Sequence, residues 1–128
     1  FGLDRRAINV GDTDAAHEIE RLWREGEEVR GWARYWAMLY GFVLDQREAD
    51  PGLGGAVMLV RYEDLCDHAE ATLEAVFAHA GLPLEPGQRS AMAARLSQPT
   101  YYDPGFTAED EAVLASETEA VRRRLGYT

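Results

Sequence analysis

The run Ala56-Val57-Met58-Leu59-Val60-Arg61-Tyr62 constrains the fold more than any other stretch of this chain. It is apolar without alternation as far as Val60, which is typical of a strand buried on both faces of a parallel sheet. Such a strand needs neighbours on both edges, because its backbone N–H and C=O groups must be paired. The other candidate, a short strand at residues 7–10, has a weak pattern. We therefore expect the missing strands to come from upstream in the same protein.

Most of the remaining sequence has helical spacing. Apolar periodicity and capping residues predict helices over about 14–29, 31–47, 68–80, 85–96 and 108–125. We expect Thr13 and Thr107 to be N-caps and Asp67 to form a capping box with Glu70. At Gly31 the first two helices either separate or continue as one. The turn-rich residues 50–55 precede the expected strand, whereas a phosphate loop follows one, so they are expected to form a turn.

Composition narrows the class of protein. The chain has 128 residues, which fits one domain or part of one, and its formal net charge of −10 argues against nucleic-acid and anionic-membrane partners. No apolar stretch is long enough to span a membrane, and no signal peptide is evident. The single cysteine, Cys66, excludes a disulfide within the chain and is compatible with a cytoplasmic location. Because the chain begins with Phe1 instead of Met, we expect upstream residues.

The segment Val60-Arg61-Tyr62-Glu63-Asp64-Leu65, followed by the helix exit Phe77-Ala78-His79-Ala80-Gly81-Leu82, resembles the C-terminal signature of bacterial sulfotransferases. The aromatic helix with Trp32 and Trp36 and the ending 125–127 agree with that pattern. The resemblance implies an α/β fold of the P-loop-like, three-layer type. Within it, residues 1–128 would be the C-terminal part of a single domain, with one central strand at about 56–62. The implied reaction transfers a sulfuryl group from 3′-phosphoadenosine 5′-phosphosulfate (PAPS) to the hydroxyl or amine of a small-molecule acceptor, without a metal.

The resemblance also implies which residues bind the donor. Tyr62 matches the tyrosine beside the donor's adenine, and Arg61 lies near the same edge. Alternation along a strand would point Arg61 the other way from Tyr62, and pairing with a carboxylate is the alternative role for it. Ser97 and Thr100 belong to a loop that approaches the ligand in the family. The phosphosulfate loop, the 3′-phosphate ligands and the catalytic groups of the family lie upstream. We therefore assign no catalytic residue to this chain and expect it to be inactive alone.

Other signals have simpler interpretations. The three histidines lack metal-ligand spacing with carboxylates or Cys66, and the arginines at 122–124 compensate the negative end of the last helix. Two other functions remain open: a non-catalytic helical interaction module that docks through residues 32–44, and a fragment of a related nucleotide kinase. An unpaired strand also favours a homo-oligomer or a swapped dimer.

Overall fold

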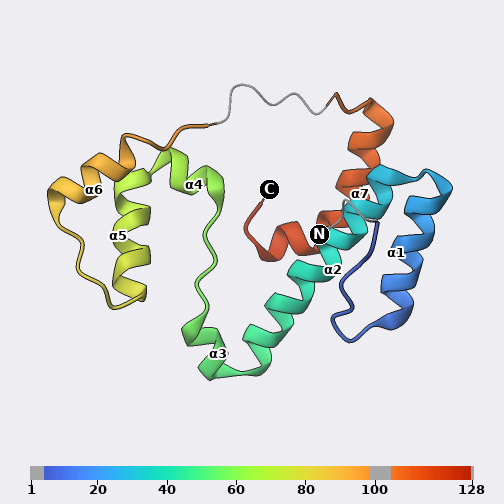
Figure 1. Ribbon diagram of the computed structural model, residues 1–128, viewed down its shortest axis with the longest axis horizontal. Coiled ribbons are helices and arrows are strands. Elements are labelled where there is room, and N and C mark those ends of the chain that lie inside the picture. Colours follow the sequence, from blue (N-terminus) through green and yellow to red (C-terminus); the bar gives the residue numbers. More distant parts are fainter. Residues whose placement is uncertain (1–4, 99–104, 128) are drawn as a thin grey trace. The chain divides into compact units, whose positions relative to one another are not determined.

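A computed structural model describes residues 5–98 and 105–127, and these residues form helices and no strand (Figure 1). The helices are α1 (Thr13–Glu25), α2 (Glu28–Ala49), α3 (Pro51–Ala56), α4 (Tyr62–Asp67), α5 (Ala69–His79), α6 (Pro86–Ala93) and α7 (Ala108–Arg124). The expected long helices are thus present with shifted ends. The expected α/β architecture is wrong for the described residues, as is the P-loop-like description that came with it.

The predicted strand at 56–62 is not formed, and its residues belong to the end of α3, a connecting segment and the start of α4. Ala56 ends α3, Tyr62 begins α4, and residues 57–60 connect the two helices without forming helix or strand. Burial alternates as in a strand, with Val57 and Leu59 half-buried and Met58 and Val60 exposed. The backbone of residues 58–60 makes no hydrogen bond to the described part of the chain. The apolar run therefore lacks the neighbouring strands that a sheet requires.

The chain divides into two compact units, residues 1–51 with 105–128 and residues 52–104. In the first unit, α2 packs against both α1 and α7. Its buried cluster consists of Ile19, Trp23 and Tyr35, with Met38 and Leu39 packed against it. The segment that precedes α1 is not a strand at residues 7–10. It runs beside the two helices, where the Ala7 N–H donates to Glu20 and the Ile8 N–H donates to the Tyr35 hydroxyl.

Trp23 is the most completely buried large side chain of this unit, with 1% of its surface exposed. Its ring centroid lies 4.7 Å from that of Trp32 and 5.5 Å from that of Tyr35. The ring also covers Gly31, where an added Cβ would lie 2.5 Å from the Trp23 ring atoms Cδ1 and Nε1. Gly31 is therefore an interior residue of α2 that admits the indole ring. The break between the first two helices occurs at Gly26, which ends α1 with φ of 87°.

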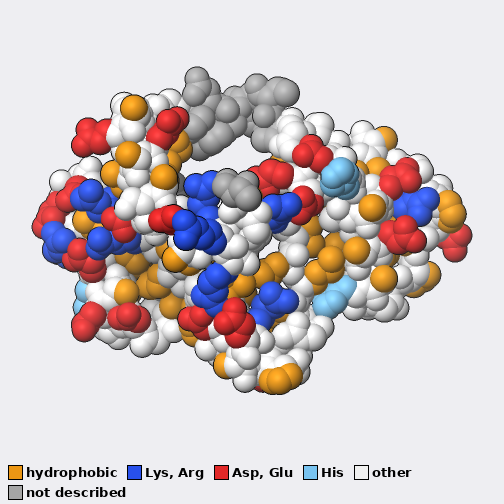
Figure 2. Space-filling view, turned by 180° about the vertical axis from the view of Figure 1, so that it is seen from behind, with side chains coloured by type: hydrophobic (Ala, Val, Ile, Leu, Met, Phe, Trp, Pro, Cys, Tyr) orange, Lys and Arg blue, Asp and Glu red, His pale blue; other side chains and the backbone are white. Residues whose placement is uncertain are grey.

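Charged pairs join α2 to α7 although the helices lie far apart in sequence. Arg34 donates from Nε to Glu117 at 2.9 Å, and Arg124 donates to Asp45 at 2.7 Å and Glu48 at 2.9 Å. The contact with Glu117 is the main reason that the pKa of Arg34 lies above its usual value. Figure 2 shows acidic and basic side chains beside one another over the helices. Exposed pairs of this kind contribute little stability each, so they mainly favour one orientation of α7 on α2.

The second unit has a smaller interior. Leu73 of α5 is the one buried residue among its described residues. Polar contacts join its parts: Ser90 of α6 donates to Glu70 of α5 at 2.9 Å, and the His79 Nε2 atom lies 3.1 Å from the Ala56 carbonyl oxygen. Leu82, just beyond α5, remains 58% exposed. This unit is thus held by local helical structure and polar contacts more than by an apolar core.

Helix ends show which capping predictions were correct. Thr107 caps α7 in a capping box with Asp110, as predicted, and Gly81 follows α5 with φ of 67°. The cap of α1 is Asp12 and not Thr13, and α5 begins after His68 with no side-chain cap. None of the helices in the described ranges combines the length and apolar character that a membrane-spanning helix requires.

The contact between Trp23 and Gly31 gives a stability prediction with a matched control in the same helix. Gly31→Ala forces the buried indole to move, and we expect it to lower the free energy of unfolding by about 1–3 kcal/mol. At Gly41 an added Cβ would meet only Val121 Cγ2, at 3.7 Å. Gly41→Ala should therefore raise the free energy of unfolding by about 0.5–1 kcal/mol. Urea unfolding followed by circular dichroism measures both, and equal effects of the two variants would contradict the packing described above.

Candidate functional site

The best candidate site is the turn that carries the motif residues Arg61 and Tyr62. Arg61 is the residue before α4, in an extended conformation with φ of −76° and ψ of 137°, and Tyr62 is the first residue of that helix. The backbone therefore changes from extended to helical between these two residues. The sequence had predicted the end of a buried strand here, whereas the structure shows the exposed start of a helix.

Arg61 forms an ion pair with Asp64, another residue of the motif. Its Nε atom donates to Oδ2 of Asp64 at 2.7 Å, and its Nη2 atom donates to Oδ1 at 2.6 Å. This two-pronged contact fits the planar fork of a guanidinium against a carboxylate. The alternative that Arg61 pairs with a carboxylate is thereby confirmed. Its guanidinium holds the turn at the start of α4 in shape, so Arg61 is a weak candidate for binding a ligand.

The same contact changes the acidity of Asp64. The hydrogen bonds from Arg61 hold the pKa of the Asp64 carboxyl below its ordinary value, while partial burial acts in the opposite direction to a smaller extent. The carboxylate therefore stays ionised at any pH near neutrality. It is a structural partner of Arg61 and is poorly suited to act as a general base, which must take up a proton near the working pH.

Tyr62 and Ser97, two of the predicted site residues, are in contact although 35 positions separate them. The Tyr62 hydroxyl donates to the Ser97 carbonyl oxygen at 3.2 Å, and the Gln98 amide donates to Asp67 at 3.3 Å. These two bonds hold the segment after α6 against α4. Tyr62 remains 50% exposed, so part of its side chain is accessible to a ligand. Thr100, the remaining predicted residue, lies outside the described residues.

Sequence reasoning missed the role of Asp67 and Gln98. We had expected Asp67 to cap the next helix, but its carboxylate accepts the hydrogen bond from Gln98. The available signal was that Gln98 is a polar residue next to the predicted site residue Ser97. That position in the sequence does not identify Asp67, 31 positions away, as its partner. Cys66, between the motif and Asp67, is a half-buried free thiol.

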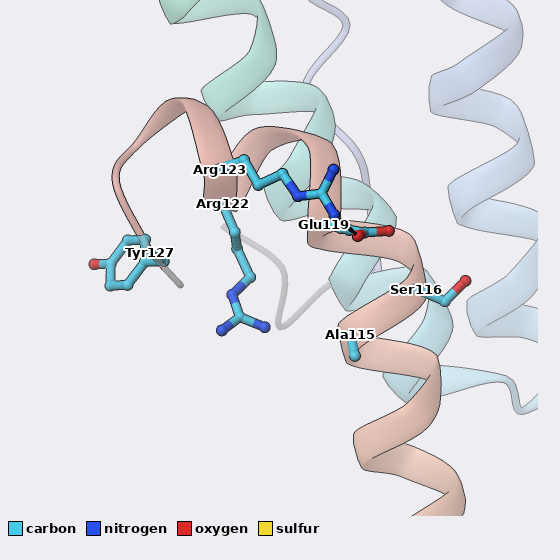
Figure 3. A pocket seen from close by; sticks show the side chains of 6 residues that line it. All are labelled: Ala115, Ser116, Glu119, Arg122, Arg123 and Tyr127. Atoms are coloured by element: carbon cyan, nitrogen blue, oxygen red, sulfur yellow. Dashed lines mark hydrogen bonds and ion pairs between the residues drawn. The ribbon is translucent and has the colours of Figure 1, made fainter.

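A concavity lies along α7 in the first unit (Figure 3). It is an open hollow of about 460 Å³ with arginines and Tyr127 along it. Arg123 pairs with Glu119, and Arg122 extends away from that pair (Figure 3). Arg124 pairs with Asp45 and Glu48 of α2. Two of the three arginines thus neutralise acidic side chains near the end of α7. This pattern agrees with the interpretation from sequence and favours a structural role for the cluster.

Among residues 5–98 and 105–127, no group of three or more histidine, cysteine or acidic side chains is arranged to hold a metal ion. Comparison of the chain with protein-family models, curated proteins and solved structures gives no match. The functional argument therefore depends on the geometry of the motif turn.

The contact between Arg61 and Asp64 predicts a measurable pKa effect. Because the ionised form of Asp64 is favoured in the folded chain, the pair stabilises the fold above the pKa of an unfolded aspartate, and this stabilisation is lost as the pH falls through the lower, folded value. Arg61→Gln should raise the pKa of Asp64 towards the ~3.9 of a free aspartate. Carboxyl ¹³C NMR titration measures the change.

Asp110 is the internal control for this titration. Its pKa is also lowered, but by the backbone N–H and the hydroxyl of Thr107. Arg61→Gln should therefore leave Asp110 unchanged. An Asp64 midpoint that does not move in the variant would show that Arg61 does not set it.

Proposed function

We propose that this chain supplies adenine-side residues to a sulfotransferase that uses PAPS and transfers its sulfuryl group to a hydroxyl or amine of a small molecule. The observation that carries the proposal is the contact between Tyr62 and Ser97, which brings two separately predicted donor-site residues together beside the motif. The helical fold of the described residues lends the proposal no support. It depends on the motif and its geometry alone.

In this proposal Tyr62 provides an aromatic surface for the adenine base. Stacking between a base and an aromatic side chain contributes roughly 1–3 kcal/mol, and it requires a side chain that is both accessible and fixed. Tyr62 is half exposed, while its hydroxyl is fixed by the Ser97 carbonyl. The contact between Arg61 and Asp64 holds the turn from which the tyrosine extends. The motif therefore positions one aromatic side chain and does not contribute a reactive group.

Sulfuryl transfer breaks the bond between sulfur and the bridging phosphate oxygen and forms a bond to the acceptor, whose proton goes to a base. Asp64 is a poor candidate for that base, because the hydrogen bonds from Arg61 favour its ionised form and lower its pKa. We therefore expect no sulfuryl transfer by the 128-residue chain alone, and we expect the remaining donor-binding groups to be supplied by other residues. A cytoplasmic location, where the Cys66 thiol stays reduced, belongs to the same proposal.

Binding of adenosine 3′,5′-bisphosphate, which is the donor without its sulfuryl group, tests the role of Tyr62. Titration of the ¹⁵N-labelled chain should shift the amide resonances of residues 61–63 and 97–98. Tyr62→Ala should weaken binding roughly tenfold through the loss of stacking, and Tyr62→Phe should keep most of it. Tyr40→Ala is the matched control, because Tyr40 is 41% exposed but belongs to α2.

Two results would contradict the proposal. Shifts confined to other parts of the chain would place the ligand elsewhere, and equal losses in the Tyr62→Ala and Tyr40→Ala variants would show that the effect is not local. A clear preference for ATP over the 3′,5′-bisphosphate would instead favour the kinase interpretation.

The second candidate is a helical interaction module, and the exposed aromatic residues of α2 favour it. Tyr40 packs on Trp36 with a ring-centroid distance of 4.8 Å yet stays 41% exposed, and Trp32 is 40% exposed. Exposed aromatic side chains are common anchors in protein interfaces. A second copy of the chain is the simplest partner to test.

Analytical ultracentrifugation over a range of protein concentrations measures such self-association. If α2 forms the interface, Tyr40→Ser should shift the equilibrium towards monomer, whereas Leu82→Ser, at an exposed site of the second unit, should not. A chain that stays monomeric at every concentration would remove the homo-oligomer from consideration.

A further inference from the structure

The segment 57–60 has backbone groups that are open to another strand. It runs between α3 and α4 as a drawn-out trace (Figure 1). The backbone N–H and C=O groups of residues 58–60 have no hydrogen-bond partner in the part of the chain that the structure describes. Burial alternates along the segment, and Met58 and Val60 are 37% and 39% exposed. Unpaired backbone groups on an alternating apolar segment are a template for pairing with another strand.

Polar contacts within the second unit hold both ends of this segment. At one end, the Nε2 atom of His79 lies 3.1 Å from the carbonyl oxygen of Ala56. At the other end, the Nε atom of Arg61 donates to Asp64 at 2.7 Å. A strand that pairs with a segment already held in place loses less conformational entropy than one that pairs with a mobile segment. The segment is therefore preorganised to accept a strand along its open edge.

The segment also lacks the features that protect exposed strand edges. Natural edges commonly carry a charged side chain or a proline that prevents pairing with another chain. Residues 52–60 contain neither, although the chain as a whole has a formal net charge of −10. Two acidic copies of the chain can therefore meet along this segment without placing like charges opposite each other.

A second copy of the chain is the partner that these observations favour, because the partner strand must itself be apolar, drawn out and open at its backbone. The other connecting segments with apolar residues do not meet this requirement. The N–H groups of Ala7, Ile8 and Leu96 already donate hydrogen bonds. Leu82 is followed by Pro83, which has no N–H. Among the described residues, the segment 57–60 is thus the best match for itself.

We propose that residues 57–60 pair antiparallel with the same segment of a second copy, about a twofold axis that passes through Met58. In this register Met58 lies opposite Met58 of the second copy, and Val57 lies opposite Leu59, so each cross-strand pair is apolar. A register centred on Leu59 would instead place Arg61 opposite Val57. The pairing does not involve a nucleotide and is independent of the function proposed above.

Disulfide cross-linking of the full 128-residue chain, in a Cys66→Ser background, tests this register. Met58→Cys places two thiols directly opposite each other, with Cα atoms about 4.5–5.5 Å apart, which a disulfide can span. Val60→Cys is the matched control, because Val60 is almost equally exposed. The two copies of that residue would lie about 13 Å apart, beyond the reach of a disulfide. We expect mild oxidation to give roughly tenfold more covalent dimer from Met58→Cys than from Val60→Cys.

Analytical ultracentrifugation provides a second measurement. Met58→Lys sets two like charges opposite each other and should raise the dissociation constant of the dimer roughly tenfold or more. Tyr40→Ser, in α2, should leave that constant unchanged. Equal cross-linking at the two positions, or none from Met58→Cys, overturns the inference, as does a dimer that Tyr40→Ser weakens and Met58→Lys does not. Circular dichroism of each variant checks that the helices are intact.

Discussion

The packing of Trp23 on Gly31 is the contact on which the helical unit depends. The indole is the largest fully buried side chain, and it occupies the space that any side chain at position 31 would need. This close approach brings α1 onto α2, which in turn provides the surface for α7. The Trp23 Nε1 atom has no hydrogen-bond partner among the described residues. At this position the indole contributes its shape and its apolar area, while its one polar atom stays without a hydrogen bond to the described residues.

The two units are stabilised in different ways. The first buries a connected set of large side chains, with Ile19, Trp23 and Tyr35 at its centre. The second buries Leu73 and relies on contacts such as that between Ser90 and Glu70. Apolar burial contributes more to stability than exposed polar contacts do. The motif turn thus belongs to the less firmly packed unit.

Within a few residues, the motif turn contains both an ion pair that shapes the backbone and a half-exposed aromatic side chain. Arg61 and Asp64 form an ion pair at the start of α4, while Tyr62 stays half exposed and donates its hydroxyl to the Ser97 carbonyl. Ser97 contributes its backbone carbonyl, so the identity of its side chain does not determine the contact. Within this motif, one ion pair shapes the turn while the neighbouring aromatic side chain stays half exposed.

Local sequence patterns were sufficient to predict most of the long helices and several of their ends. Apolar spacing predicted the long helix that became α2, and Thr107 was correctly predicted to cap α7, because these signals act within a few residues. Pairing of Arg61 with a carboxylate was the alternative to donor binding that the sequence left open, and Asp64 is that carboxylate. Sequence reasoning failed at residues 56–62, where an apolar run suited to a strand has no neighbouring strand among the described residues. Only the tertiary structure decided that Gly31 admits Trp23 and that Tyr62 meets Ser97, because such contacts depend on chain paths that local patterns do not specify.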